Sequence, residues 1–203
     1  MKILAVGRNY AEHIEELKNE RPQEPVIFTK PDTALLKENA PFYLPDYTKN
    51  VHHEVEIILR VGREGKSVQE KHALSYLDGI GIGLDFTARD LQDKAKKKGL
   101  PWTLAKGFNG SAPVSHFSPL SSYENIHDLN FRLEIDNEIR QEGNTKLMIF
   151  KFEYIIAFIS KFITLKRGDI IFTGTPSGVG QVKIGNVLHA YIEDKKLLEC
   201  EVK

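Results

Sequence analysis

Short apolar runs recur along this chain, and several alternate with polar or glycine positions at every second residue. Around Glu56, for example, Val55, Ile57 and Leu59 fall on one face. Alternation with a period of two is typical of a β-strand. The same pattern, or a short β-branched run, predicts strands before residue 7 and at 25–30, 54–59, 80–85, 129–135, 139–141, 170–172, 187–192 and 197–200. The two stretches on either side of Asp136 predict a hairpin.

Four segments have the signals of helices, at 9–18, 67–77, 87–99 and 152–162. The first begins at Asn9 with an acid three residues later, and the second begins with the capping-box pair Ser67 and Glu70. The third is basic, and the last is strongly apolar and therefore expected in the core. Many short strands with a few helices between them predict an α+β fold dominated by mixed sheet.

Composition narrows the class of protein. The chain has 203 residues and a formal net charge of zero, which argues against a nucleic-acid binder or a membrane-surface protein. The longest apolar stretch, 154–163, is shorter than the roughly 20 residues of a membrane span, and we see no signal peptide. The single cysteine, Cys200, excludes an internal disulfide and a thiolate zinc site. We therefore expect one domain over 1–203 in a cytoplasmic protein.

Two acidic side chains on one strand are the most informative feature. Glu54 and Glu56 point to the same face, opposite Val55 and Ile57, and like charges this close destabilise a sheet unless a cation lies between them. Asp85, at the end of a later glycine-rich strand, supplies a third oxygen ligand. An all-oxygen set suits Mg²⁺, Mn²⁺ or Ca²⁺. The competing interpretation is a solvated polar sheet face.

Three other features carry candidate chemistry. Lys106 lies among apolar and aromatic residues, where an amine can stabilise an enolate, although its stem can equally pack while its head reaches solvent. His13 and Glu16 are three apart on the first predicted helix, which suits a general base but also describes many inert surface pairs. The glycine-rich segment 173–180, which includes Thr175, allows close approach of an anion, with low specificity.

Taken in order, these segments resemble the fumarylacetoacetate hydrolase superfamily, in its short acylpyruvase/oxaloacetate decarboxylase-like branch. The resemblance covers essentially the whole chain, and its motifs occupy 7–13, 52–56, 84–92, 98–106 and 173–180. It implies a mixed β-sandwich roll with a few peripheral helices, a homodimer, and a segment at about 9–24 that acts as a lid. It also implies Mg²⁺ or Mn²⁺ held by Glu54, Glu56 and Asp85.

The resemblance assigns roles to further residues. Lys106 is expected to contact the substrate's oxygens, while Gln92 and Thr175 bind its carboxylate end. Arg8, Lys30 and Arg89 match positions near the family's site. His13 and Glu16 match the water-activating pair of hydrolytic members, carried on the lid.

The expected function is a Mg²⁺- or Mn²⁺-dependent hydrolase that cleaves acylpyruvate-type 2-oxo acids to pyruvate and a carboxylate, with oxaloacetate decarboxylation as a further activity. One alternative is an isomerase or tautomerase of 2-oxo/2-hydroxy-ene acids, including oxaloacetate. A second alternative, from another class, is a non-catalytic module with a structural metal. The expected partner is a small 2-oxo acid, with no nucleic acid and no membrane.

Overall fold

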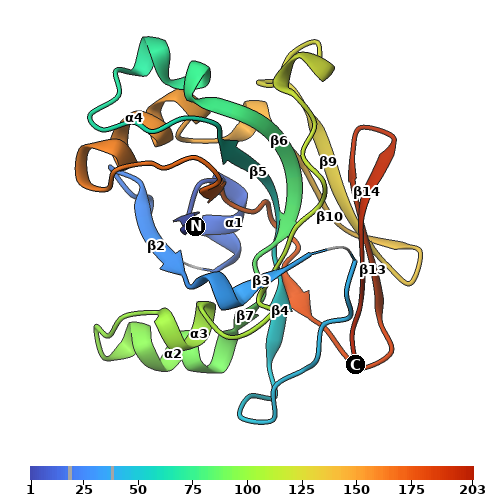
Figure 1. The fold of residues 1–203 in the computed structure, drawn as a ribbon. Coiled ribbons are helices and arrows are strands. Elements are labelled where there is room, and N and C mark those ends of the chain that lie inside the picture. Colours follow the sequence, from blue (N-terminus) through green and yellow to red (C-terminus); the bar gives the residue numbers. More distant parts are fainter. Residues whose placement is uncertain (18–19, 38) are drawn as a thin grey trace.

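A five-stranded mixed sheet runs through the centre of the computed structural model, which describes residues 1–17, 20–37 and 39–203. Its strands, in spatial order, are β2 (Val26–Lys30), β1 (Ile3–Gly7), β11 (Ile170–Phe172), β5 (Val55–Val61) and β6 (Leu77–Leu84). β1 and β11 are parallel, and the other neighbours are antiparallel. Figure 1 shows β5 and β6 curving strongly along the side of this sheet.

A four-stranded antiparallel sheet packs beside the first (Figure 1). Its strands, in spatial order, are β10 (Glu138–Asn144), β9 (Asn130–Ile135), β13 (Val187–Ile192) and β14 (Lys195–Glu201). β9 and β10 form the predicted hairpin. Two small sheets complete the strands: β12 (Gly180–Gln181) with β4 (Val51–His53) and β7 (Thr87–Ala88), and β3 (Leu35–Leu36) with β8 (Ala112–Pro113).

The helices lie around the edges of the sheets and are few. They are α1 (Ala11–Glu16), α2 (Arg89–Lys97), α3 (Thr103–Lys106) and α4 (Phe152–Phe162), with 3₁₀ turns η1 (Asp32–Ala34), η2 (Glu70–Tyr76), η3 (Leu120–Ser122) and η4 (Thr145–Leu147). In Figure 1, α2 and α3 lie at one end of the curved sheet and α4 at the other. The predicted mixed β-sandwich roll with peripheral helices is confirmed. None of the described helices is long and apolar enough to span a membrane.

The core lies between the sheets and is built from alternating strand residues. Ile57 and Leu59 of β5 are fully buried in the main apolar cluster, as their spacing predicts. The glycines of β6 allow close packing: a Cβ added to Gly83 would lie 2.9 Å from the Phe172 ring and 3.0 Å from the Pro113 carbonyl oxygen. The expected close approach at this strand is therefore present. Cys200 is buried on β14.

Two predicted helix starts are wrong, for different reasons. Asn9 caps no helix; its amide donates to the Thr173 carbonyl at 2.7 Å and accepts from the Phe150 N–H at 2.7 Å. The Ser67 capping box opens no α-helix either, because Ser67 adopts a left-handed conformation (φ 51°) and a 3₁₀ segment begins only at Glu70. The predicted end of the first helix, at residue 18, lies outside the described residues.

Candidate active site

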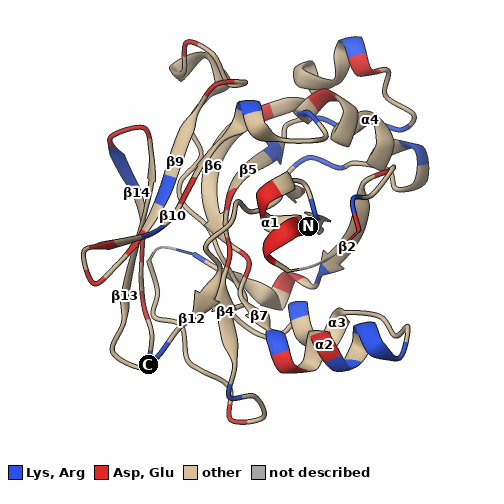
Figure 2. Ribbon diagram, turned by 180° about the vertical axis from the view of Figure 1, so that it is seen from behind, with Lys and Arg blue, Asp and Glu red and all other residues tan. Residues whose placement is uncertain are grey.

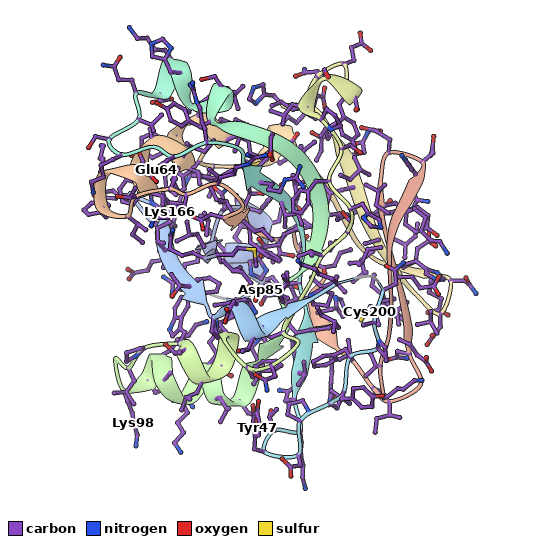
Figure 3. All side chains as sticks on the ribbon, viewed as in Figure 1. Tyr47, Glu64, Asp85, Lys98, Lys166 and Cys200 are labelled. Atoms are coloured by element: carbon purple, nitrogen blue, oxygen red, sulfur yellow. The ribbon has the colours of Figure 1, made fainter. Side chains whose placement is uncertain are left out.

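One pocket lies between α1, the start of β5 and the helices α2 and α3. Nine of the eleven residues singled out in the sequence line it: Arg8, His13, Glu54, Glu56, Asp85, Arg89, Gln92, Lys106 and Thr175. The other two contact lining residues: Glu16 contacts His13, and Lys30 contacts Asp85. Figure 3 shows Asp85 in the middle of the molecule, whereas Lys98, just beyond α2, points outward.

Strand pairing explains why three carboxylates meet. Val55 pairs with Leu84 and Glu56 pairs with Gly83, so Glu54, just before β5, lies opposite Asp85, just after β6. One oxygen from each of Glu54, Glu56 and Asp85 lies within 4.8 Å of the others, and all three residues are buried. The solvated sheet face considered from the sequence is therefore wrong.

Two lysines compensate part of this charge. Lys106 donates to Glu54 Oε2 at 2.8 Å and to Asp85 Oδ2 at 2.6 Å. Burial alone would lower the pKa of Lys106, but Asp85 and Glu54 hold it above its usual value. Lys30 Nζ lies 2.6 Å from Asp85 Oδ1 but donates its hydrogen bonds to backbone carbonyls and to Ser111. Lys106 is fully buried here, so the solvent-facing alternative is excluded.

Arg89 joins α2 to the carboxylates. Its Nη2 donates to Glu54 Oε1, and its Nη1 donates to Gln92 Oε1 at 2.6 Å. Burial would raise the pKa of Glu54, but Lys106 and Arg89 bring it well below the usual range. Arg89 is thus occupied by Glu54 and Gln92 and orients both.

The residues present fit a hard divalent cation. Burial, together with Asp85 and Glu54, raises the pKa of Glu56 well above its usual value, so a nearby cation would favour its charged form. Asp85 Oδ1 is buried and accepts no hydrogen bond from the described residues. A divalent ion between these oxygens would favour the charged form of Glu56 and give Asp85 Oδ1 a partner. An all-oxygen set of ligands selects Mg²⁺, Mn²⁺ or Ca²⁺ over zinc or copper.

His13 and Glu16 form a pair at the pocket wall. His13 Nδ1 lies 3.1 Å from Glu16 Oε2, and Glu16 Oε1 accepts from the Gly178 N–H at 3.0 Å. Burial lowers the pKa of His13, although Glu54 and Glu16 oppose this shift. The lowered pKa favours the neutral imidazole, which is the form that can accept a proton.

The glycine-rich segment binds carboxylates, as expected, but they belong to the protein itself. Gly174 N–H donates to Glu56 Oε2 at 2.6 Å, and Gly178 N–H to Glu16. Gly174 has φ +105°, a conformation that favours glycine. The segment thus positions one proposed metal ligand and one member of the His13 pair, while Thr175 faces the pocket.

Sequence reasoning missed several residues of the site. Phe28 and Trp102 line one wall with ring centroids 5.7 Å apart, and Lys106 Nζ lies 5.1 Å from the Phe28 ring. Gln141, buried on β10, binds Thr175 from behind. Nothing in the local sequence marks Gln141, because its partners come from β5 and from the segment around Thr175. Trp102 lies within the recognised motif at 98–106, so the sequence offered a signal for it.

A group of positively charged residues lies at the edge of the pocket. Arg8 and Lys96 are half-buried lining residues, and no carboxylate among the described residues forms an ion pair with either. Burial lowers the pKa of Lys96, and Arg89 and Arg8 lower it further. Figure 2 shows Lys and Arg segments gathered along α2. The pocket therefore combines three buried carboxylates with two more exposed basic residues at its edge.

Known proteins are similar to this chain in sequence and in fold. The mitochondrial oxaloacetate tautomerase FAHD1 of Bos taurus is 50% identical over 201 residues, covering 99% of this chain and 91% of that protein. A mitochondrial oxaloacetate decarboxylase of Dictyostelium discoideum is 44% identical over 188 residues, covering 92% of this chain and 86% of that protein. A fumarylpyruvate hydrolase from Pseudomonas aeruginosa, solved with Mn²⁺ and pyruvate, is 32% identical with a TM-score of 0.94, covering 100% of this chain and 89% of that chain.

The family assignment follows from the whole chain and not from one motif. The profile of the fumarylacetoacetate (FAA) hydrolase C-terminal family matches residues 2–203. This match includes all the residues that line the pocket, from Val6 to Thr175. The chain therefore belongs to the fumarylacetoacetate hydrolase family of enzymes.

Proposed function

We propose that this protein is a Mg²⁺- or Mn²⁺-dependent enzyme that interconverts the keto and enol forms of oxaloacetate or a similar short 2-oxo dicarboxylic acid. The observation that carries the proposal is that one pocket holds two separate groups of charged residues, one acidic and one basic. A divalent cation fits the group made by Glu54, Glu56 and Asp85. A second carboxylate of the substrate fits Arg8 and Lys96, which form no ion pair with any carboxylate of the described residues. The 50% identity to an oxaloacetate tautomerase supports the same substrate class.

The bound cation supplies Lewis-acid polarisation of the 2-keto group, which acidifies the neighbouring C–H. The neutral His13 imidazole accepts the C3 proton, and Glu16 orients the ring and stabilises the imidazolium that forms. Lys106 remains protonated and stabilises the developing enolate oxygen. Return of the proton to the enolate oxygen gives the enol, and no water is consumed. Opposite pKa shifts on His13 and Lys106 suit a base and an acid in one site.

A second candidate is the acylpyruvate hydrolase expected from the sequence. The hydrogen-bonded pair His13 and Glu16 favours it, because the same imidazole can take a proton from water. Hydroxide then adds to the distal carbonyl, the C–C bond breaks, and the electron pair forms the pyruvate enolate, which is protonated at carbon. The fold shared with a fumarylpyruvate hydrolase supports this reading. Oxaloacetate decarboxylation passes through the same enolate.

One assay separates these candidates. Enol-oxaloacetate absorbance and pyruvate release are followed for oxaloacetate and acetylpyruvate, with Mg²⁺, with Mn²⁺ and with EDTA. We expect metal-dependent loss of enol absorbance that exceeds pyruvate release. No acceleration over metal-containing buffer overturns the tautomerase, and no pyruvate from acetylpyruvate overturns the hydrolase. If Mg²⁺ binds but oxalate does not, the metal is structural and both enzyme proposals fail.

Other expectations from the sequence stay predictions. We propose a homodimer, which light scattering during gel filtration tests directly, and a lid over residues 9–24, of which 18–19 lie outside the described residues. Cell fractionation tests the predicted cytoplasmic location, because the two relatives named above are described as mitochondrial.

A further inference from the structure

Gln141 lies behind the pocket and connects three separate parts of the chain. It is 1% exposed and belongs to β10 of the four-stranded sheet, but its side chain reaches the start of β5 and the segment around Thr175. Its strand has an irregularity in pairing between Ile139 and Gln141. An extra residue in a strand redirects the side chains that follow it. Here Ile139 is exposed, whereas Gln141 faces inward.

The orientation of the Gln141 amide is fixed by two backbone groups. The Val55 N–H, which can only donate, lies 3.0 Å from Oε1. The Pro176 carbonyl, which can only accept, lies 3.0 Å from Nε2. The oxygen and nitrogen of the amide therefore cannot be exchanged without opposing like groups at both positions.

This orientation determines the hydrogen bonds of two neighbouring side chains. His53 Nδ1 lies 2.9 Å from Oε1, so His53 must donate from Nδ1. On the other side, Nε2 donates to Thr175 Oγ1 at 2.9 Å. Gln141 thus uses all four of its hydrogen-bonding positions.

We propose that Gln141 is a positioning residue that makes the Thr175 hydroxyl a donor to the anionic end of the substrate. Because Thr175 accepts from Gln141, its own proton must point away from the amide. Thr175 lines the pocket, and none of the described residues accepts a hydrogen bond from its hydroxyl. A carboxylate oxygen in the pocket is the acceptor that this proton lacks. The proposal rests on the proposed function, in that the site takes a 2-oxo acid anion.

A double-mutant cycle on the Mg²⁺-loaded protein tests the proposal, with oxalate as the probe and calorimetry as the readout. Thr175→Val removes the donor and is expected to weaken oxalate binding about 10-fold to 100-fold. Thr175→Ser retains the hydroxyl and should restore most of the affinity. Gln141→Glu retains the acceptor for the Val55 N–H but offers Thr175 an acceptor in place of a donor. It should weaken oxalate binding by a similar factor by turning the Thr175 proton away from the pocket.

The double variant distinguishes positioning from packing. If Gln141 acts through Thr175, adding Gln141→Glu to Thr175→Val produces no further loss of oxalate affinity. Unchanged oxalate affinity in Gln141→Glu, with only a lower melting temperature, overturns the proposal. So does a loss in the double variant equal to the product of the two single losses.

A measurement on the unaltered protein keeps the proposal testable if Gln141→Glu does not fold. The ¹⁵N chemical shifts of His53 should show a protonated Nδ1. A bare Nδ1 would reverse the amide of Gln141 and overturn the proposal. Failure of the wild-type protein to bind oxalate with Mg²⁺ would count against the proposed function, whereas the His53 result is independent of it.

Discussion

Nδ1 of His13 lies 3.1 Å from Oε2 of Glu16, within a single helix, and the other oxygen of Glu16 is held by the Gly178 N–H. The imidazole is therefore oriented by a carboxylate that is itself fixed to a different part of the chain. Since burial lowers the pKa of His13, the neutral imidazole, which can accept a proton, is favoured.

Replacing His13 should abolish proton transfer without unfolding the protein. We expect His13→Ala to lower kcat by about 10²-fold to 10⁴-fold on oxaloacetate or acetylpyruvate, whichever the wild type converts. Glu16→Gln should show a smaller loss, because the ring remains but loses its charged partner. Glu15→Gln on the exposed side of the same helix is the matched control. Steady-state kinetics of the four proteins check this, and wild-type kcat in His13→Ala would contradict it.

Replacing a proposed metal ligand should weaken metal binding while relieving charge repulsion in the metal-free protein. Glu56→Gln is expected to weaken Mn²⁺ binding by more than about 10-fold, measured by calorimetry. Burial beside Asp85 and Glu54 disfavours the charged form of Glu56, so the metal-free variant should melt no lower than the metal-free wild type. Glu124→Gln, an exposed glutamate, should change neither quantity. Equal Mn²⁺ affinity in wild type and Glu56→Gln would show that Glu56 is not a ligand.

The positive edge of the pocket predicts a preference for dicarboxylates. Lys96→Met should raise KM for oxaloacetate by about 10-fold through loss of a charged contact, and raise KM for the monocarboxylate acetylpyruvate much less. Lys94→Met, on an exposed position of the same helix, is the control for net charge. Measuring both substrates in all three proteins checks the prediction. Equal KM increases for the two substrates would place the second carboxylate elsewhere.

Gly174 should be intolerant of a side chain. Its φ is +105°, and an added Cβ would lie 2.6 Å from the Asn9 Cβ, so Gly174→Ala must shift the backbone that donates to Glu56. Gly99→Ala is the matched control, because Gly99 also has positive φ (+63°) but no atom within 4 Å of the added Cβ. We expect about 1 kcal/mol of destabilisation in Gly99→Ala and more in Gly174→Ala, measured by urea unfolding. Only Gly174→Ala should also weaken Mn²⁺ binding. If the two variants had equal effects on stability and on Mn²⁺ binding, backbone strain alone would be the cause.

Local patterns predicted most of the elements. The apolar run at 152–162 is helix α4, and the alternating stretches at 130–135 and 187–192 are strands β9 and β13. These predictions succeed because burial of one face depends on residue spacing that is visible in the sequence. The helix start at Asn9 failed for the opposite reason. Asn9 satisfies backbone groups of Thr173 and Phe150, more than 140 positions away in sequence, as the separations of 164 and 141 residues show.

By itself, the sequence determined the chemical types at the site and which of them share a strand or a helix. Glu54 with Glu56, and His13 with Glu16, follow from periods of two and of about four. Only the tertiary structure decided what those groups meet. Strand pairing placed Asp85 opposite Glu54, and a strand of the second sheet placed Gln141 behind Thr175. Periodicity fixes the direction of a side chain along its own element, whereas its partners depend on how distant elements pair and pack.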